Sequence, residues 1–187
     1  IMGAVYSSYD DITASNGQEE VDKLLNAMIT VSDNDSANTL VGMLGNGNDA
    51  AGQEAVNTYC KNNGYTDTSM GRMLLEKASA NENYTSARDC SVFLKNIYEN
   101  KLEHSEDMLN LLKQQTRTEK IPKGVPAGVE TANKTGELDH VENDAAIVFD
   151  GENPYIICVM ADNLSDTTEA RQRIVDISSV VYENISK

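Results

Sequence analysis

The sequence is poor in positive charge and in long apolar runs, and each shortage excludes a class of partner. It carries 15 Lys and Arg residues against 30 Asp and Glu residues, a formal net charge of −15. Nucleic acid or an anionic membrane surface would repel such a chain, so neither is expected as a partner. No apolar run approaches the roughly 18 residues of a membrane span. The 187 residues still suffice to bury a core, as one domain or as two interleaved lobes.

Cysteine is also scarce. Cys60, Cys90 and Cys158 lie far apart, with no Cys-x-x-Cys pair and no nearby histidine. This spacing argues against zinc binding and dithiol redox chemistry. An odd number leaves at least one free thiol, and we expect all three side chains to pack as small apolar groups.

The first six residues, Ile1 to Tyr6, are mostly apolar and have neither the basic start nor the length of a signal peptide. They resemble the end of a helix whose first turns lie upstream. We therefore expect an incomplete or processed chain. The composition fits a secreted or wall-exposed protein and a cytosolic one equally well.

The first two thirds of the sequence has helical periodicity. Apolar residues recur at helical spacing over residues 18–31 and again before Gly45, which is expected to cap the second helix. A third helix is expected over residues 49–62, and its inward face is predicted to consist of Ala51, Ala55, Tyr59 and Cys60.

The pattern lapses over residues 64–83, which we expect to form a long surface loop. Two further amphipathic segments follow it. Thr85 is expected to cap the first of these helices and Ser105 the second, because a hydroxyl at this position accepts a hydrogen bond from the first helical turn.

Strand signals begin after Ile121. Strands are expected over residues 129–138, 144–149 and 155–161. The segment Asp150-Gly151-Glu152-Asn153-Pro154 predicts a turn, so the last two strands should pair antiparallel. A helix over residues 169–185 is expected to close the chain.

This order of helices, strands and one last helix predicts an α+β fold rather than βαβ winding. We expect a helical lobe over residues 1–120 and a sheet lobe over residues 121–187, interleaved as one domain.

Two short motifs carry the chemistry. Ser32-Asp33-Asn34 stands where a loop leads into a helix, and Lys134-Thr135-Gly136 lies on the first predicted strand. Each tripeptide alone arises by chance, but the pair in this order and context is specific. Flanking residues 28–38 and 126–136 extend the match. The chain thus resembles the C-terminal part of class A β-lactamases and penicillin-binding serine hydrolases. The resemblance implies a β-lactamase/transpeptidase-like fold whose N-terminal strands are missing here.

The resemblance implies two catalytic residues. Ser32 would pass a proton to the departing nitrogen, although a helix N-cap would also explain a serine there. Lys134 would hold Ser32 and the substrate carboxylate through charge-assisted hydrogen bonds, although a solvated strand lysine is the plain alternative. Asp33 is expected to tie the loop together.

Four more residues would bind substrate on the same resemblance. Asn34 would bind the amide of the substrate side chain, and Thr135 its carboxylate. Gly136 would let the substrate lie against bare backbone. The backbone N–H of Glu137 would be one of two oxyanion donors.

The nucleophile motif of the family, Ser-x-x-Lys, is absent, since no serine in the chain has a lysine three positions on. A serine hydroxyl attacks poorly until a base takes its proton. We expect the motif upstream of Ile1, and we expect the 187-residue chain alone to be unable to form an acyl-enzyme.

The glutamate that activates the deacylating water in class A β-lactamases has no counterpart either. Its place falls near Leu74, which cannot act as a base. Glu76 and Glu82 are close by, but neither has an asparagine at the required offset. Slow deacylation would give a penicillin-binding protein or a D-alanyl-D-alanine carboxypeptidase.

The sequence therefore predicts a serine hydrolase that cleaves β-lactam amide bonds through an acyl-serine intermediate. A D-alanyl peptide enzyme with slow deacylation and a non-catalytic scaffold of the same fold stay as alternatives. The family implies no metal or organic cofactor and an extracytoplasmic location, secreted or anchored. The missing segment, or another chain, is expected to complete the sheet beside residues 155–161, because that edge would otherwise be unpaired.

Overall fold

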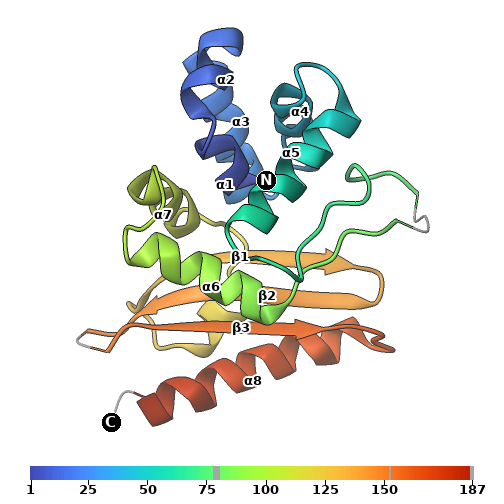
Figure 1. Cartoon of the computed structure of the whole chain (residues 1–187). Helices are drawn as coiled ribbons and strands as arrows, with labels where there is room; N and C mark the ends of the chain where they lie inside the picture. Colours follow the sequence, from blue (N-terminus) through green and yellow to red (C-terminus); the bar gives the residue numbers. More distant parts are fainter. Residues whose placement is uncertain (78–80, 152, 186–187) are drawn as a thin grey trace.

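A computed structural model describes residues 1–77, 81–151 and 153–185 (Figure 1). No helix within these ranges is both long and apolar enough to cross a membrane. In chain order the described elements are α1 (Met2–Tyr6), α2 (Tyr9–Asn16), α3 (Gln18–Thr30), α4 (Asn34–Leu44), α5 (Asp49–Asn62), α6 (Ala87–Tyr98), α7 (Ser105–Lys113), the 3₁₀ helix η1 (Ile121–Gly124), β1 (Glu130–Leu138), β2 (Val141–Phe149), β3 (Tyr155–Ala161) and α8 (Thr167–Ile185).

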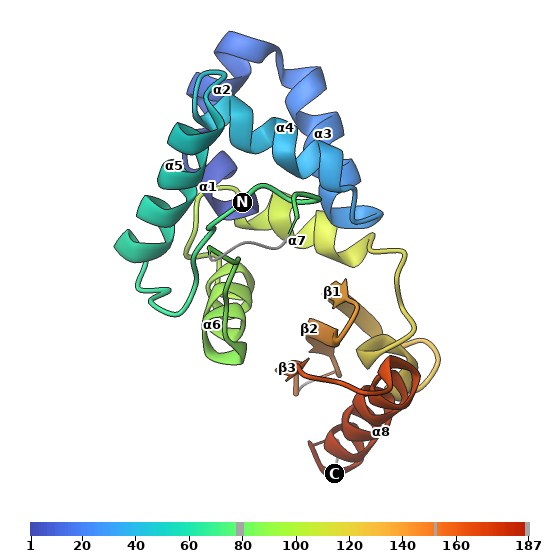
Figure 2. The same ribbon diagram turned by 90° about the vertical axis from the view of Figure 1, so that its right-hand side faces the viewer.

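The described strands form one antiparallel sheet in the order β1-β2-β3. Helix α8 covers one face of it, while α6 packs on β3 and α7 on β1 from the other side (Figure 2). Helices α1 to α5 lie beyond α7, away from the sheet (Figure 2). The predicted α+β class and the antiparallel pairing of the last two strands are confirmed.

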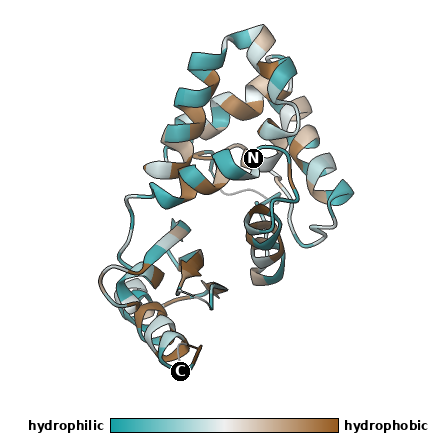
Figure 3. Cartoon of the chain, turned by 90° about the vertical axis from the view of Figure 1, so that its left-hand side faces the viewer, coloured by the Kyte–Doolittle hydropathy of each residue, from teal (hydrophilic) through white to brown (hydrophobic). Residues whose placement is uncertain are grey.

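Strand β2 connects two of the apolar cores. Its side chains alternate between the two faces of the sheet, as the strand period of two requires. Ala145 and Ile147 pack in the core on the side of α6 and α7, whereas Ala146 and Val148 pack in the core on the side of α8. Strands β2 and β3 are mostly apolar along their length, whereas β1 is mostly polar, and the helices carry both apolar and polar residues (Figure 3).

The expected helices over residues 18–31, 49–62 and 169–185 and the strand over residues 155–161 are confirmed to within two residues at each end. Gly45 is the C-cap of α4, as expected. Glu152, which the predicted turn includes, lies outside the described residues.

The caps of two helices were predicted one residue away from their true positions. Ser86, not Thr85, caps α6, and its Oγ accepts a hydrogen bond from the backbone N–H of Asp89 at 3.1 Å. Ser105 begins α7 instead of capping it, and its hydroxyl donates to Leu102 O at 2.7 Å. In both places the predicted cap and the observed one are adjacent residues, and a sequence pattern does not locate a helix end to one residue.

Two further expectations held only in part, because residues in segments that read as exposed are buried. Strand β2 starts at Val141, three residues before the predicted Asp144, since the carboxylate of Glu142 lies buried beside Lys120. The expected loop over residues 64–83 has no helix or strand among its described residues, but Tyr65, Met70 and Met73 in it are buried and pack in one cluster with α5. Helix α2 was not predicted, because its sequence is largely polar.

The inward face of α5 was predicted only in part. Cys60 is buried, as expected, whereas Ala51 is exposed and the unpredicted Gly52 and Val56 are buried. At Gly52 the helix crosses α4 so closely that a Cβ atom would lie 1.9 Å from Val41 O. A glycine carries no apolar signal, so the sequence could not reveal this contact. The contact matters because α4 carries the Ser32-Asp33-Asn34 loop at its N-terminus.

Gly52→Ala is expected to lower the free energy of unfolding by at least about 1–3 kcal/mol, because the added methyl group forces α5 away from the α4 backbone. Urea denaturation followed by circular dichroism measures the change. Ala51→Ser, at the exposed neighbouring position, is the control and should stay within about 0.5 kcal/mol of the parent. An equally small change for Gly52→Ala would contradict the close crossing.

Candidate active site

Ser32 and Lys134 meet although 102 residues separate them. Lys134 Nζ lies 2.8 Å from Ser32 Oγ, and it also donates to Thr135 O at 2.7 Å. Ser32 lies in the loop between α3 and α4, and Lys134 lies near the middle of β1, with both residues half-buried. This hydrogen bond joins the helices to the sheet.

The loop holds Ser32 in an unusual conformation. Its φ is +62°, a left-handed value that costs a non-glycine residue roughly 1–2 kcal/mol. Asp33 supports it: its N–H donates to Ala27 O at 3.1 Å, and its Oδ2 accepts from the Ser36 N–H at 2.7 Å. Asp33 is thus the N-cap of α4, which confirms its structural role and excludes the N-cap explanation for Ser32.

The segment after α7 holds this loop from the opposite side. Gln115 Nε2 donates to Ile29 O at 2.6 Å, and both the N–H and the hydroxyl of Thr116 donate to Thr30 O at 2.9 Å. These bonds bring Arg117 next to Lys134. No local sequence pattern predicts these bonds, because they join positions 86 residues apart.

The register of β1 on β2 places the second motif. Thr135 pairs with Asp144 and Gly136 with Asn143. Asp144 is buried and accepts hydrogen bonds from Asn133 Nδ2 at 3.1 Å and from Ile121 N at 3.0 Å. β1 therefore has a fixed position on the sheet.

Gly136 is not required by the packing of the protein itself. A Cβ atom built there would have no nearer heavy atom than the Cβ of Asn143, at 3.7 Å, which is ordinary van der Waals contact. The space that a side chain would enter belongs to the cavity that Gly136 lines. A glycine here leaves room for a ligand to lie against the backbone of β1.

The pKa of Lys134 lies much closer to neutral pH than that of an ordinary lysine. Burial, and after it the positive charge of Arg117, lower the pKa of Lys134 to about 8, while Asp144 and Glu137 oppose the shift. The ammonium group is therefore charged at pH 7, and it can lose its proton more readily than an exposed lysine.

The end of β1 is anchored by buried ion pairs. Lys120 Nζ lies 2.6 Å from Glu142 and 3.0 Å from Glu137, and Arg171 lies 2.6 Å from Glu142. Burial alone would raise the pKa of Glu142, but hydrogen bonds from Arg171 and Lys120 lower it overall. Both Lys120 and Glu142 are almost fully buried, so removing either partner would leave a costly unpaired charge.

All six predicted site residues line one cavity of about 800 Å³. They are Ser32, Asn34, Lys134, Thr135, Gly136 and Glu137. Among the described residues that line it, Ser32 is the one serine. The cavity holds a hydroxyl, an ammonium group and exposed strand backbone, which suits a ligand with a carboxylate next to an amide.

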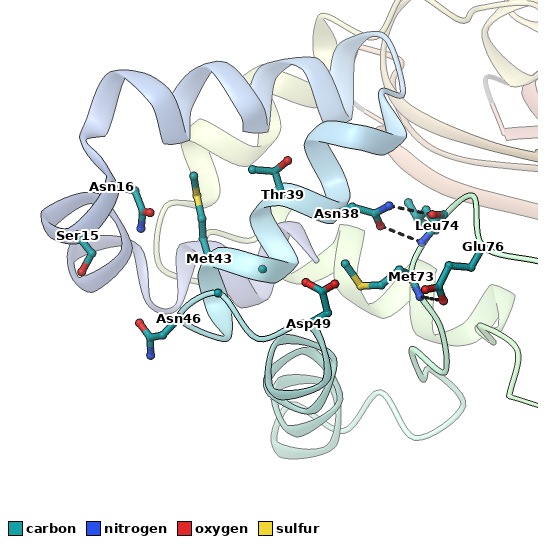
Figure 4. A pocket seen from close by; sticks show the side chains of 12 residues that line it. Ser15, Asn16, Asn38, Thr39, Met43, Asn46, Asp49, Met73, Leu74 and Glu76 are labelled. Atoms are coloured by element: carbon teal, nitrogen blue, oxygen red, sulfur yellow. Dashed lines mark hydrogen bonds between the residues drawn. The ribbon is translucent and has the colours of Figure 1, made fainter.

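Leu74 faces this cavity with its backbone fixed. The side chain of Asn38 donates to Leu74 O at 2.8 Å and accepts from Leu74 N at 2.9 Å (Figure 4). Leu74 also lines a second cavity of about 680 Å³, together with Thr39 and Met43 of α4 (Figure 4). An apolar side chain is thus held at the cavity wall.

The two nearby glutamates are engaged in the loop itself. Glu76 Oε2 accepts from the N–H of Met73 at 3.2 Å, and Glu82 pairs with Arg72 Nε at 2.9 Å. In the part of the chain that the structure describes, no three His, Cys, Asp or Glu side chains gather as a metal site.

Comparisons with known proteins agree with this geometry. A family model described as "Beta-lactamase enzyme family" matches residues 10–185. A β-lactamase from Sphaerobacter thermophilus DSM 20745 is 25% identical, with a TM-score of 0.77 over 87% of this chain and 62% of that one. The TLA-1 extended-spectrum β-lactamase is 22% identical, with a TM-score of 0.79 over 89% of this chain and 64% of that one. No curated protein sequence matched.

A third similar structure is a leucine-to-glutamate mutant of PBP-A, captured as its acyl-enzyme complex with penicillin G. It is 24% identical, with a TM-score of 0.76 over 87% of this chain and 60% of that one. The chain thus spans about three fifths of the length of these solved structures.

The ¹³Cε resonance of Lys134 is expected to titrate with a midpoint near pH 8, against about 10.4 for a free lysine. Below that midpoint the side chain is charged and can hold an anion. Above it, the side chain is neutral and anion binding weakens. Lys134→Arg removes the signal and so assigns it, and Arg117→Met is expected to move the midpoint upward. A midpoint above 10 would contradict the desolvated position.

Proposed function

The chain belongs to the β-lactamase enzyme family, and on this premise we propose that it forms the larger part of a serine hydrolase that acts through an acyl-serine intermediate. The 2.8 Å contact between Lys134 Nζ and Ser32 Oγ, in a cavity lined by both motifs, is the observation that carries the proposal. The substrate is a β-lactam, whose carboxylate lies next to an amide nitrogen.

Each residue has a defined task. Lys134 binds the substrate carboxylate and orients the hydroxyl of Ser32, and Thr135 adds a hydrogen bond to the same carboxylate. The nucleophilic serine attacks the carbonyl, the C–N bond breaks, and Ser32 passes the proton to the departing nitrogen. Asn34 binds the substrate side chain, and the N–H of Glu137 stabilises the oxyanion.

We propose that the nucleophile comes from a Ser-x-x-Lys segment encoded upstream of Ile1. The 187 residues contain no such motif, and the hydroxyl of Ser32 already accepts a hydrogen bond from Lys134. The extracytoplasmic location, secreted or anchored, is part of the same proposal, because the cell-wall peptides that share the substrate's carboxylate and amide lie outside the membrane.

The edge of β3 supports a further part of the proposal. Within the described residues β3 pairs with β2 alone, so its second row of backbone N–H and C=O groups is available for pairing. The upstream segment, or another chain, would add a strand there. Amide hydrogen exchange on β3 should then be slower in a longer gene product than in the 187-residue chain.

Penicillin G is expected to leave the intact mass of the 187-residue chain unchanged and to add one acyl group to a longer gene product that carries Ser-x-x-Lys.

In the longer product, Ser32→Ala should slow adduct formation by about 10²–10⁴-fold, because it removes the proton transfer. Gly136→Ala should also slow it without changing Tm, because the new methyl group enters only the cavity.

An adduct on the 187-residue chain would contradict the absence of the nucleophile. If neither product is labelled, the enzyme proposal fails and a non-catalytic scaffold of the same fold replaces it.

A second candidate function is that of a penicillin-binding or D-alanyl-D-alanine carboxypeptidase enzyme with slow deacylation. The apolar side chain of Leu74 at the cavity wall favours it, because Glu76 and Glu82 are both engaged in loop contacts. A water molecule at the acyl-serine would then have no carboxylate base to activate it.

Leu74→Glu in the longer product is expected to shorten the lifetime of the penicillin adduct by about tenfold or more, since it introduces that base. Intact mass against time after removal of free drug measures the lifetime. Leu75→Glu, which adds the same charge at the exposed next position, is the matched control. Equal lifetimes in the parent and Leu74→Glu would contradict this assignment of Leu74.

A further inference from the structure

Beyond Gly136, the face of the sheet that borders the cavity becomes apolar. Alternate side chains of a strand lie on the same face, so Lys134, Gly136 and Leu138 of β1 share one face. The register places Val141 of β2 opposite Leu138, and it places Met160 of β3 in the same row as Gly136. All five residues line the cavity of about 800 Å³. We call Leu138, Val141 and Met160 the apolar floor.

The apolar floor is open to the cavity, and Leu138 is its most exposed member. Leu138 is 63% exposed, while Val141 and Met160 are half-buried. A single exposed leucine would need no explanation, but three adjoining apolar side chains in a cavity are typical of a ligand site. An apolar group that covers them removes apolar surface from water, which is favourable.

The polar side chains beside the floor are engaged elsewhere. Glu137 alternates to the other face of β1, where its carboxylate lies 3.0 Å from Lys120 Nζ. Asn143 stands beside the floor on β2, and its side-chain oxygen accepts a hydrogen bond from Ala161 N at 3.2 Å. A charged ligand group over the floor would lose its hydration and gain no counter-ion from either residue.

The floor lies one substrate length away from the expected carboxylate site. Residues of a strand advance about 3.3 Å each, so Leu138 lies roughly 13 Å along β1 from Lys134, with Gly136 between them. A substrate whose carboxylate binds Lys134, and which lies against the bare backbone at Gly136, places its opposite end over the floor. In a penicillin this end is the acyl side chain, which is joined to the β-lactam ring through an amide.

We infer that the apolar floor binds the acyl side chain of the substrate, so that the enzyme selects β-lactams whose side chain is apolar over those that carry a charge there. The inference rests on the proposed function and narrows its substrate class. It makes Leu138 a specificity-determining residue, which contacts the substrate but takes no part in making or breaking bonds.

Penicillin G and carbenicillin are matched probes, because carbenicillin differs only by a carboxylate on the benzyl carbon of the side chain. In the longer gene product, penicillin G should form the adduct at least about tenfold faster than carbenicillin, as measured by intact mass against time. Leu138→Lys should abolish or reverse this preference, because its ammonium group pairs with the added carboxylate. Equal rates in the parent, or an unchanged ratio of rates in Leu138→Lys, would overturn the inference.

Val180→Lys is the matched control for the added charge. Val180 lies on α8, is 58% exposed and does not line the cavity, so the substitution places the same charge on another exposed apolar residue. It should leave the ratio of the two rates unchanged. An equal change of the ratio in both variants would show an effect of net charge instead of contact with Leu138, and it would also overturn the inference.

A binding experiment on the 187-residue chain tests the floor without acylation. The probes are penicillin G and 6-aminopenicillanic acid, which has the same ring nucleus and carboxylate but no acyl side chain. Both should shift the ¹³Cε resonance of Lys134, whereas only penicillin G should shift the methyl resonances of Leu138 and Met160. Methyl shifts with both probes, or with neither, would overturn the inference. If this pattern is found and the longer product still forms no adduct, the proposed function fails while the floor stands as a side-chain site.

Discussion

The hydrogen bond from Lys134 to Ser32 is the constraint on which the site depends, because it fixes the helices and the sheet relative to each other at the point where both motifs meet. Neither partner would hold this position alone. Ser32 has a left-handed backbone conformation, and Lys134 gives up solvation of its charge. Both costs persist only because surrounding contacts fix the geometry, which is typical of functional sites.

The supporting contacts come from three separate parts of the chain. Asp33 caps α4 and fixes the loop from within. Gln115 and Thr116 are hydrogen-bonded to the end of α3, and this places Arg117 next to Lys134. The ion pairs of buried Lys120 with Glu137 and with buried Glu142 hold the end of β1. These residues therefore position the site even where they do not line it.

The cavity between the helices and the sheet brings the parts of the proposed acyl-transfer site together. It is lined by the hydroxyl of Ser32, the ammonium group of Lys134 and the backbone of β1. Glu76 and Glu82 line the cavity too, but both are engaged in loop contacts, with Met73 and Arg72 respectively. The loop that carries Leu74 thereby supports the proposed slow deacylation.

The sequence by itself determined the α+β class, most helices and strands, and the two motifs with the six site residues, all of which line the cavity. Periodicity and tripeptide motifs are local, so they can be read without coordinates. Only the tertiary structure decided which residues meet across long separations, such as Gln115 with Ile29 and Lys120 with Glu142. It also decided where glycine and charge are buried, as at Gly52. Such contacts depend on how packed elements cross, and no local pattern encodes that.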